Sequence, residues 1–157
     1  MLQTNTVDAN TLELLIKLQS DEHLINFHLA GGTSLALQLG HRKSIDLDLF
    51  SLDIFDSNNL LEHLEQNYNF KTDYFEQNTL KGSINSVKID LISHKYPLVR
   101  PITKIENIRL YSIEDIAAMK LNVIAGNGTR SKDFIDLYFI LKTFNLNQTL
   151  DFYARKY

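Results

Sequence analysis

Two aspartates that alternate with apolar residues carry the strongest chemical signal in the sequence. Asp46 and Asp48 lie in the segment Ser44-Ile-Asp-Leu-Asp-Leu-Phe50, where polar and apolar residues alternate. In a β-strand this alternation places both carboxylates on one face. Neighbouring unpaired carboxylates repel each other, and a hard cation held by oxygen ligands relieves the repulsion. The pattern therefore indicates a Mg²⁺ site, since Mg²⁺ also binds phosphates.

A diglycine turn precedes these aspartates. Residues 27–30 are apolar enough for a short buried strand, and Gly31 and Gly32 then permit backbone conformations that other residues avoid. Thr33 and Ser34 follow at the expected start of a helix. Such a helix start presents free N–H groups and the positive end of the helix dipole to an anion. We therefore expect this turn to hold phosphate.

Each of the two motifs also has an ordinary structural explanation. A lone Asp-x-Asp pair is common on solvated strand edges, and a lone Gly-Gly pair is usually only a turn. Their spacing, with Arg42 and Ser44 between them, favours a site instead. In that site a nucleotide would bridge the glycine turn and the metal ion.

An acid also interrupts a later apolar strand, Val87-Lys-Ile-Asp-Leu-Ile92. Alternation places Asp90 on one face together with Lys88 and Ile92. An acid in such a strand is expensive to bury unless it is paired or bound to metal. Asp90 is thus either a third metal ligand or a residue at a strand end that meets Lys88 or solvent.

A lysine and two further acids lie in the expected C-terminal helices. A capping-box pattern, Ser112-Ile-Glu-Asp115, marks the start of one helix, and Lys120 falls within the apolar stripe of that helix. Such a lysine either extends to the edge of the stripe or points its ammonium group at an anion in a cleft. In the next helix, Asp133 and Asp136 lie three residues apart. Their ordinary explanations are a favourable helix dipole for Asp133 and a salt bridge for Asp136.

Two stretches resemble the signature of the AbiEii/AbiGii nucleotidyltransferase toxins, a branch of the DNA polymerase β-like nucleotidyltransferase superfamily. They are Gly31-Gly32-Thr33-Ser34-Leu35-Ala36 and His41-Arg42-Lys43-Ser44-Ile45-Asp46-Leu47-Asp48-Leu49-Phe50. The later stretch Arg130-x-Lys-Asp-x-x-Asp-Leu resembles the last motif of that family. The resemblance covers most of the chain.

The resemblance implies a fold, an activity and a biological role. The fold is α+β, a nucleotidyltransferase fold with a small mixed β-sheet, flanking helices and C-terminal helices. The implied activity is transfer of a nucleotidyl group from a metal-bound nucleoside triphosphate to an RNA, such as tRNA, or to a protein. The implied role is that of a bacterial or archaeal toxin, neutralised by an antitoxin encoded beside it.

The resemblance also implies roles for individual residues. Asp46, Asp48 and Asp90 hold metal, and three carboxylates are enough for two Mg²⁺ ions. Lys120 binds phosphate and stabilises the transition state. Asp136, preferred here over Asp133, supports the active site as a base or by orienting the lysine. The expected nucleotide-binding residues are Gly31, Gly32, Thr33, Ser34, Arg42, Ser44 and Lys120.

The remaining elements are expected to position this site. Apolar periodicity predicts helices from residue 10, over 57–67, from 112, from 130 and over 146–157. Alternation predicts strands over 70–75, 80–92 and 109–111. We expect one domain over 1–157, with a sheet core over about 24–111 and a helical part over about 112–157. The expected core stripe of the first helix is Leu12, Leu15, Ile16 and Leu18, and that of the helix from 130 is Phe134, Leu137, Tyr138 and Leu141.

Composition excludes several classes of protein. The 157 residues are 44% hydrophobic and 22% charged and include no cysteine, which is typical of a cytoplasmic globular domain. The sequence has no apolar run of membrane-spanning length and no signal-peptide pattern at its start. Its five histidines, at 23, 28, 41, 63 and 94, do not pair at helical metal-ligand spacing. We therefore expect no zinc site.

Charge is distributed unevenly along the chain. Residues 1–80 hold 12 acidic and 4 basic residues, whereas residues 81–109 hold 2 acidic and 6 basic residues. If the basic side chains face the carboxylates, they can attract a triphosphate or an RNA backbone. The alternative is a solvated strand-loop-strand segment whose lysines only add solubility.

Two other functions remain open at the level of sequence. One is a non-catalytic nucleotide- or partner-binding module on the same fold, which clustered acids disfavour. The other is phosphotransfer to a protein, which uses similar phosphate and metal contacts.

Overall fold

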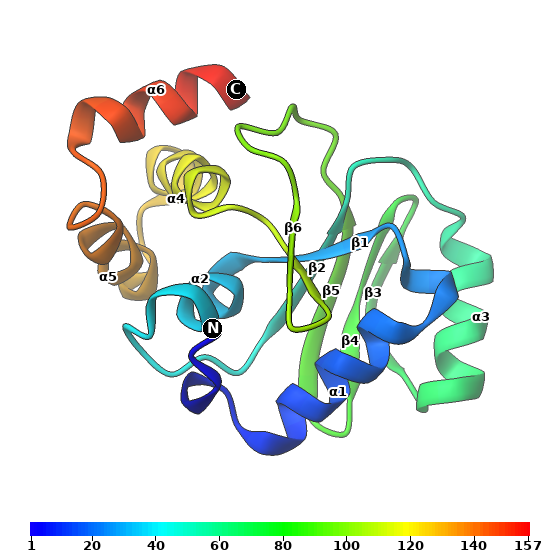
Figure 1. The fold of residues 1–157 in the computed structure, drawn as a ribbon. Helices are drawn as coiled ribbons and strands as arrows, with labels where there is room; N and C mark the ends of the chain where they lie inside the picture. The colour runs from blue at the N-terminus through cyan, green and yellow to red at the C-terminus, as the bar shows by residue number, and fades with distance from the viewer.

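A mixed sheet of seven strands forms the centre of the molecule, and helices cover both of its faces (Figure 1). The computed structural model describes all residues, 1–157. The strand order is β3-β4-β5-β2-β1-β7-β6. The strands are β1 (Phe27–Ala30), β2 (Leu47–Ser51), β3 (Lys71–Glu76), β4 (Thr79–Ile84), β5 (Val87–Ser93), β6 (Thr103–Ile105) and β7 (Ile108–Leu110). The helices are α1 (Ala9–Ser20), α2 (Gly31–Leu39), α3 (Ser57–Tyr68), α4 (Ile113–Asn127), α5 (Ser131–Ile140) and α6 (Leu146–Lys156).

The unit β1-α2-β2 forms as the sequence predicts. Helix α2 begins directly at Gly31 and ends at Gly40, whose φ of +70° is the left-handed conformation common at helix C-termini. The chain then returns as β2, which runs antiparallel to β1 with Ala30 opposite Asp48. This return brings the first turn of α2 next to the aspartate strand.

Strand β5 lies parallel to β2 and carries the third acid. Their register places Asp48 opposite Asp90, so the two carboxylates project from the same face of the sheet. The intervening leucines of both strands point to the opposite face. The parallel pairing therefore joins acids that lie more than 40 residues apart in the sequence.

Two apolar cores lie on the two sides of the sheet. The larger core contains Leu47, Leu49 and Leu91 of the sheet and packs under α1 and α3. The second core surrounds Tyr111 and joins α4 and α6 to the other side of the sheet. Figure 1 shows α1 and α3 apart from the group formed by α4, α5 and α6. Because strand residues alternate between these cores, the acids of β2 and β5 lie on the side of α4 and α5.

Several predicted elements differ from the structure. The expected strand over 80–92 is two strands, β4 and β5, joined by a turn at Asn85 and Ser86, both with positive φ. Polar residues in the left-handed region make this two-residue reversal possible without glycine. Strand β6 was not predicted, because three residues are too short for a detectable alternation.

The first helix starts earlier than predicted. Asp8, not Asn10, is its N-cap and accepts a hydrogen bond from the backbone N–H of Asn10. Its buried residues include Leu14, while Ile16, predicted to lie in the core, is 44% exposed. Even the longest helix, α4, is too short and too polar to cross a bilayer.

The side of helix α5 that was expected to form its apolar core stripe is largely exposed. Phe134 and Tyr138 are 48% and 60% exposed, whereas Asp133, Asp136 and Ile140 are buried. The apolar stripe was therefore a wrong prediction. Its acids are buried because basic side chains of α4 and of the segment after α2 form ion pairs with them.

A buried ion pair fastens α6 to α4. Lys156 Nζ lies 2.8 Å from Asp115 Oδ1 and 3.0 Å from the carbonyl oxygen of Pro97, and both charged side chains are fully buried. Asp115 also accepts hydrogen bonds from the backbone N–H groups of Val99 and Arg100. The pair thus joins the last helix to the loop before β6.

Replacing Lys156 by methionine should destabilise the protein, because the Asp115 charge would stay buried without its cation. Loss of one partner of a buried pair costs about 3–5 kcal/mol of unfolding free energy. Urea unfolding measures the change. Lys95→Met, at an exposed lysine, is the control and should change stability by no more than about 0.5 kcal/mol. Equal effects of both substitutions would contradict a structural role for the pair.

Candidate active site

A cavity of about 360 Å³ lies where α2, β2, β5 and α4 meet. Its walls contain most of the residues that the sequence singled out. Asp46, Asp48 and Lys81 line it on the side of the sheet, and Lys120, Lys132 and Asp133 line it on the side of α4 and α5. The charged lining residues are Arg42, Asp46, Asp48, Lys81, Lys120, Arg130, Lys132 and Asp133.

Asp46 and Asp48 line the sheet side of the cavity, and Asp90, which does not line it, lies beside Asp48. Asp48 and Asp90 are direct neighbours across β2 and β5, and Asp46 precedes β2 by one residue. Lys81 Nζ of β4 lies 3.7 Å from Asp90 Oδ2, while Asp90 Oδ1 is buried and has no hydrogen-bond partner. The oxygens of the three residues do not all come within 4.8 Å of one another. The three acids are therefore neighbours, but their oxygens do not form one compact ligand group.

The environment of Asp48 disfavours its charged form. Burial raises its pKa first, and the charges of Asp90 and Asp46 raise it further, to about 6 from an ordinary value of 3.8. The charge of Lys120 acts in the opposite direction but does not compensate. A cation bound beside Asp48 would favour its charged form.

The two glycines are required by close approaches on both sides of the turn. Gly31 has a φ of +66°, and a Cβ there would overlap Asp48 Oδ2. A Cβ on Gly32 would overlap the guanidinium group of Arg42. The diglycine turn thus brings the first turn of α2 against an acid and a base of the site. No side chain caps this helix start.

The hydroxyl residues after the glycines act differently from the prediction. Thr33 Oγ1 donates to the backbone oxygen of Asp46 and lies 2.8 Å from Ser44 Oγ, so it holds the segment that carries the aspartates. Ser34 is fully buried, lies near Gln38 and does not line the cavity. The expectation that Ser34 binds phosphate is wrong, because the helix turns its side chain away from the site.

Lys120 lies between the two acids of α5. Its Nζ is 2.7 Å from Asp133 Oδ1 and 2.8 Å from Asp136 Oδ2, and its side chain is only 7% exposed. Arg130 also pairs with Asp133 at 3.0 Å. The lysine therefore does not extend to the edge of the apolar stripe, and its ammonium group is directed to the cavity by two carboxylates.

Asp136 is the centre of a second network. Arg42 donates to both of its oxygens, from Nε at 2.7 Å and from Nη2 at 2.9 Å, and His41 Nε2 lies 2.7 Å from Oδ1. Burial pushes the pKa of Asp136 upward, but hydrogen bonds from His41, Arg42 and Lys120 outweigh burial and hold this pKa well below its ordinary value. A fully buried carboxylate of such low basicity is a positioning group for Lys120 and Arg42 and is unsuited to act as a base.

Some cavity residues were not predicted as part of the site. Lys81, Lys132 and Phe50 line it, and so does Arg130, which the sequence analysis quoted only as part of a motif. Of the locally basic segment 81–109, Lys81 reaches the cavity, but Arg109 instead bonds backbone carbonyls of Gln19 and Leu24. The segment is thus not a continuous basic surface facing the acids.

Replacing Asp48 by asparagine should stabilise the protein at neutral pH. Between about pH 4 and pH 6 the folded protein keeps a proton on Asp48 that the unfolded chain has released, so the unfolding free energy falls as pH rises through this range. Asparagine does not titrate, so Asp48→Asn removes this fall of the unfolding free energy with rising pH. We expect a gain of up to about 3 kcal/mol near pH 7.5 and no gain below about pH 4.

Urea unfolding of both proteins at the two pH values measures this difference. Asp53→Asn, at an exposed aspartate shortly after β2, is the matched control and should be neutral at both pH values. A wild-type protein that is more stable than Asp48→Asn at neutral pH would show that the acid cluster is not electrostatically unfavourable.

Solved structures with the same fold are nucleotidyltransferases or resemble them. The solution structure of the antibiotic-resistance factor ANT(2'')-Ia matches with a TM-score of 0.69 at 15% identity, over 98% of this chain and 91% of that chain. JHP933 from Helicobacter pylori matches with a TM-score of 0.60 at 21% identity, over 95% and 73%. The Megavirus polyadenylate synthase matches with a TM-score of 0.58 at 14% identity, over 84% and 31%. At these identities the likeness establishes the nucleotidyltransferase fold alone.

Sequence comparisons add the family. An uncharacterized protein, aq_aa25, of Aquifex aeolicus (strain VF5) is 32% identical over 121 residues, which cover 74% of this chain and 58% of that protein. This chain thus spans somewhat more than half the length of that relative. The model of the family described as nucleotidyl transferase AbiEii toxin, Type IV TA system, matches residues 13–100 and 68–157. With its fold, its diglycine turn and its acid pair, the chain belongs to the AbiEii nucleotidyl transferase toxin family.

Proposed function

We propose that this protein is a metal-dependent nucleotidyltransferase that acts as the toxin of a toxin–antitoxin system. The observation that carries the proposal is the cavity lined by Asp46, Asp48 and Lys120 at the uncapped start of α2, with Asp90 beside Asp48 on the neighbouring strand. One wall offers carboxylates for a cation, and the other offers N–H groups and cations for a triphosphate. Membership of the AbiEii family supports the same activity.

Asp46, Asp48 and Asp90 fit Mg²⁺ as the metal. All are oxygen donors, as Mg²⁺ requires, and Asp90 Oδ1 is a buried oxygen without a partner. Burial, and after it the charges of Asp90 and Asp46, raise the pKa of Asp48, and a bound cation would stabilise its charged form. When bound, one or two such ions would favour deprotonation of the attacking hydroxyl and stabilise the negative charge on the leaving pyrophosphate.

The other residues of the site would hold and polarise the triphosphate. The first N–H groups of α2, at Gly31 and Gly32, have no side-chain cap and are available to phosphate oxygens. Lys120 would stabilise the charge that develops during transfer, and Asp133 and Asp136 would keep its ammonium group in place. Arg42, which is held by Asp136, lies against Gly32, and its guanidinium group would offset the negative charge of a phosphate bound there.

The proposed reaction transfers a nucleotidyl group to a hydroxyl of an acceptor. The acceptor oxygen forms a bond to the α-phosphorus, the bond from that phosphorus to the bridging oxygen breaks, and pyrophosphate leaves. The proton of the hydroxyl passes to solvent. Lys81, Arg130 and Lys132 at the cavity suit an anionic acceptor such as an RNA end, tRNA included, and a protein side chain is the other candidate.

Substituting one acid of the cluster should abolish transfer. With labelled nucleoside triphosphates, Mg²⁺ and cell RNA or protein, wild-type protein should label an acceptor. Asp48→Asn and Asp90→Asn should each lower the rate about 100-fold or more, because charge stabilisation in the site is lost. Asp53→Asn should retain the wild-type rate.

The mass of the labelled acceptor distinguishes the possible chemistries, since a nucleotidyl adduct is far heavier than a phosphoryl adduct. Undiminished labelling by Asp48→Asn would rule out the proposed site. If no triphosphate labels an acceptor or raises the melting temperature in the presence of Mg²⁺, the fold serves as a non-catalytic binding module.

The toxin role predicts growth arrest that depends on the same acids. Induction of the wild-type gene in a bacterial host should reduce colony formation, and co-expression of its genomic neighbour, the expected antitoxin, should restore it. Asp48→Asn should be harmless at an equal protein level. Growth arrest by Asp48→Asn would show that the toxicity does not depend on nucleotidyl transfer.

A further inference from the structure

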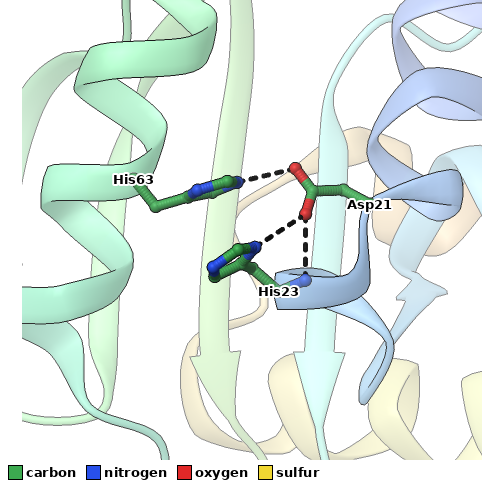
Figure 2. A group of neighbouring side chains, drawn as sticks. All are labelled: Asp21, His23 and His63. Carbon is green, nitrogen blue, oxygen red and sulfur yellow. Dashed lines mark hydrogen bonds and ion pairs between the residues drawn. The ribbon is translucent and has the colours of Figure 1, made fainter.

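A second group of potential metal ligands lies on the opposite side of the sheet from the cavity. Asp21 follows α1 and caps the short 3-10 helix η2 (Glu22–Leu24), which contains His23, while His63 belongs to α3. Figure 2 shows the two imidazole rings one above the other, both directed at the carboxylate of Asp21. None of these residues lines the active-site cavity.

The distances bring three different ligand atoms close together. His63 Nε2 is 2.7 Å from Asp21 Oδ2, and His23 Nδ1 is 3.2 Å from Asp21 Oδ1. One ligand atom from each residue lies within 4.8 Å of the other two (Figure 2). It is the one such group of histidine and acidic residues in the chain. Two imidazoles and one carboxylate form a common protein ligand set for zinc.

Surrounding side chains hold two of the three groups in place. Tyr68 donates a hydrogen bond of 2.5 Å to Asp21 Oδ2, and Asn67 Nδ2 lies 3.2 Å from the other ring nitrogen of His63, Nδ1. A metal-binding carboxylate usually has an outer partner such as Tyr68, which fixes its orientation. Burial raises the pKa of Asp21, but hydrogen bonds from Tyr68 and His63 outweigh it and bring this pKa to about 2. The carboxylate is therefore ionised in neutral solution.

His23 is the most exposed member of the group. Its side chain is 62% exposed, compared with 16% for His63 and 11% for Asp21. The two rings stack with centroids 3.7 Å apart and planes inclined by 17°. Because the lone pairs of the ring nitrogens lie in these nearly parallel planes, they do not point at one common position. Convergence on one ion requires the His23 ring to turn, and its exposure leaves room for that turn and for entry of the ion.

We propose that Asp21, His23 and His63 form a binding site for a zinc ion, with water in the remaining coordination position. Nitrogen ligands select zinc over Mg²⁺, which prefers oxygen. The ion would join η2 to α3, two elements that flank the larger core, without a contact to the acid cluster. This site is independent of the proposed nucleotidyl transfer, so either proposal can fail alone.

Calorimetric titration of chelator-treated protein with Zn²⁺ alone tests the site. We expect one ion per chain and a rise in melting temperature, because an ion that binds only the folded state stabilises it. Co²⁺ in place of Zn²⁺ should give a visible absorption band, which reports direct coordination. His23→Gln should weaken Zn²⁺ binding at least about tenfold and remove the Co²⁺ band.

Matched variants identify the ion's position. His63→Gln tests a second ligand, and exposed Glu22→Gln, beside His23, controls for loss of a nearby polar group. Asp48→Asn controls for binding at the active-site acids. Zn²⁺ binding that persists in Glu22→Gln and Asp48→Asn but is lost in both histidine variants supports the site. Unchanged affinity in His23→Gln and His63→Gln, loss in Asp48→Asn, or no saturable binding would overturn it.

Discussion

The repulsion between carboxylates of neighbouring strands is the constraint on which the site depends. Asp48 and Asp90 are opposite each other in a parallel pair of strands, and Asp48 is buried enough for its pKa to rise to about 6. A protein keeps such an unfavourable arrangement only where surrounding structure fixes it. Here the fixing elements are the leucines of β2 and β5, which pack into the larger core on the other face of the sheet.

Basic groups on the opposite wall are held by acids of their own. Lys120 lies between Asp133 and Asp136, and Arg42 makes a two-point contact with Asp136. These buried acids explain why α5 turns its charged side inward and its aromatic residues outward. Their positions make them suited to hold the cations toward the cavity, and the low pKa of Asp136 makes that residue a poor base.

The two sides of the sheet thus carry different chemistry. Oxygen donors gather on the side of α4 and α5, where a hard cation and a phosphate are suited to the groups present. On the side of α1 and α3, Asp21, His23 and His63 form a group with two nitrogen donors, which favours a softer ion. The sheet separates these groups, so occupation of one does not require the other.

Local sequence patterns determined the parts of this protein that depend on near neighbours. Alternation in β2 and β5 assigned the acids to one face, and Gly31 and Gly32 marked a turn that the structure requires to be without side chains. Pairing between distant segments was decided only by the tertiary structure. It buried the acids of α5 against Lys120 and brought His23 to His63 despite their separation in the sequence. The reason is physical: periodicity reports which residues share a face, whereas ion pairs and metal ligands depend on which faces meet.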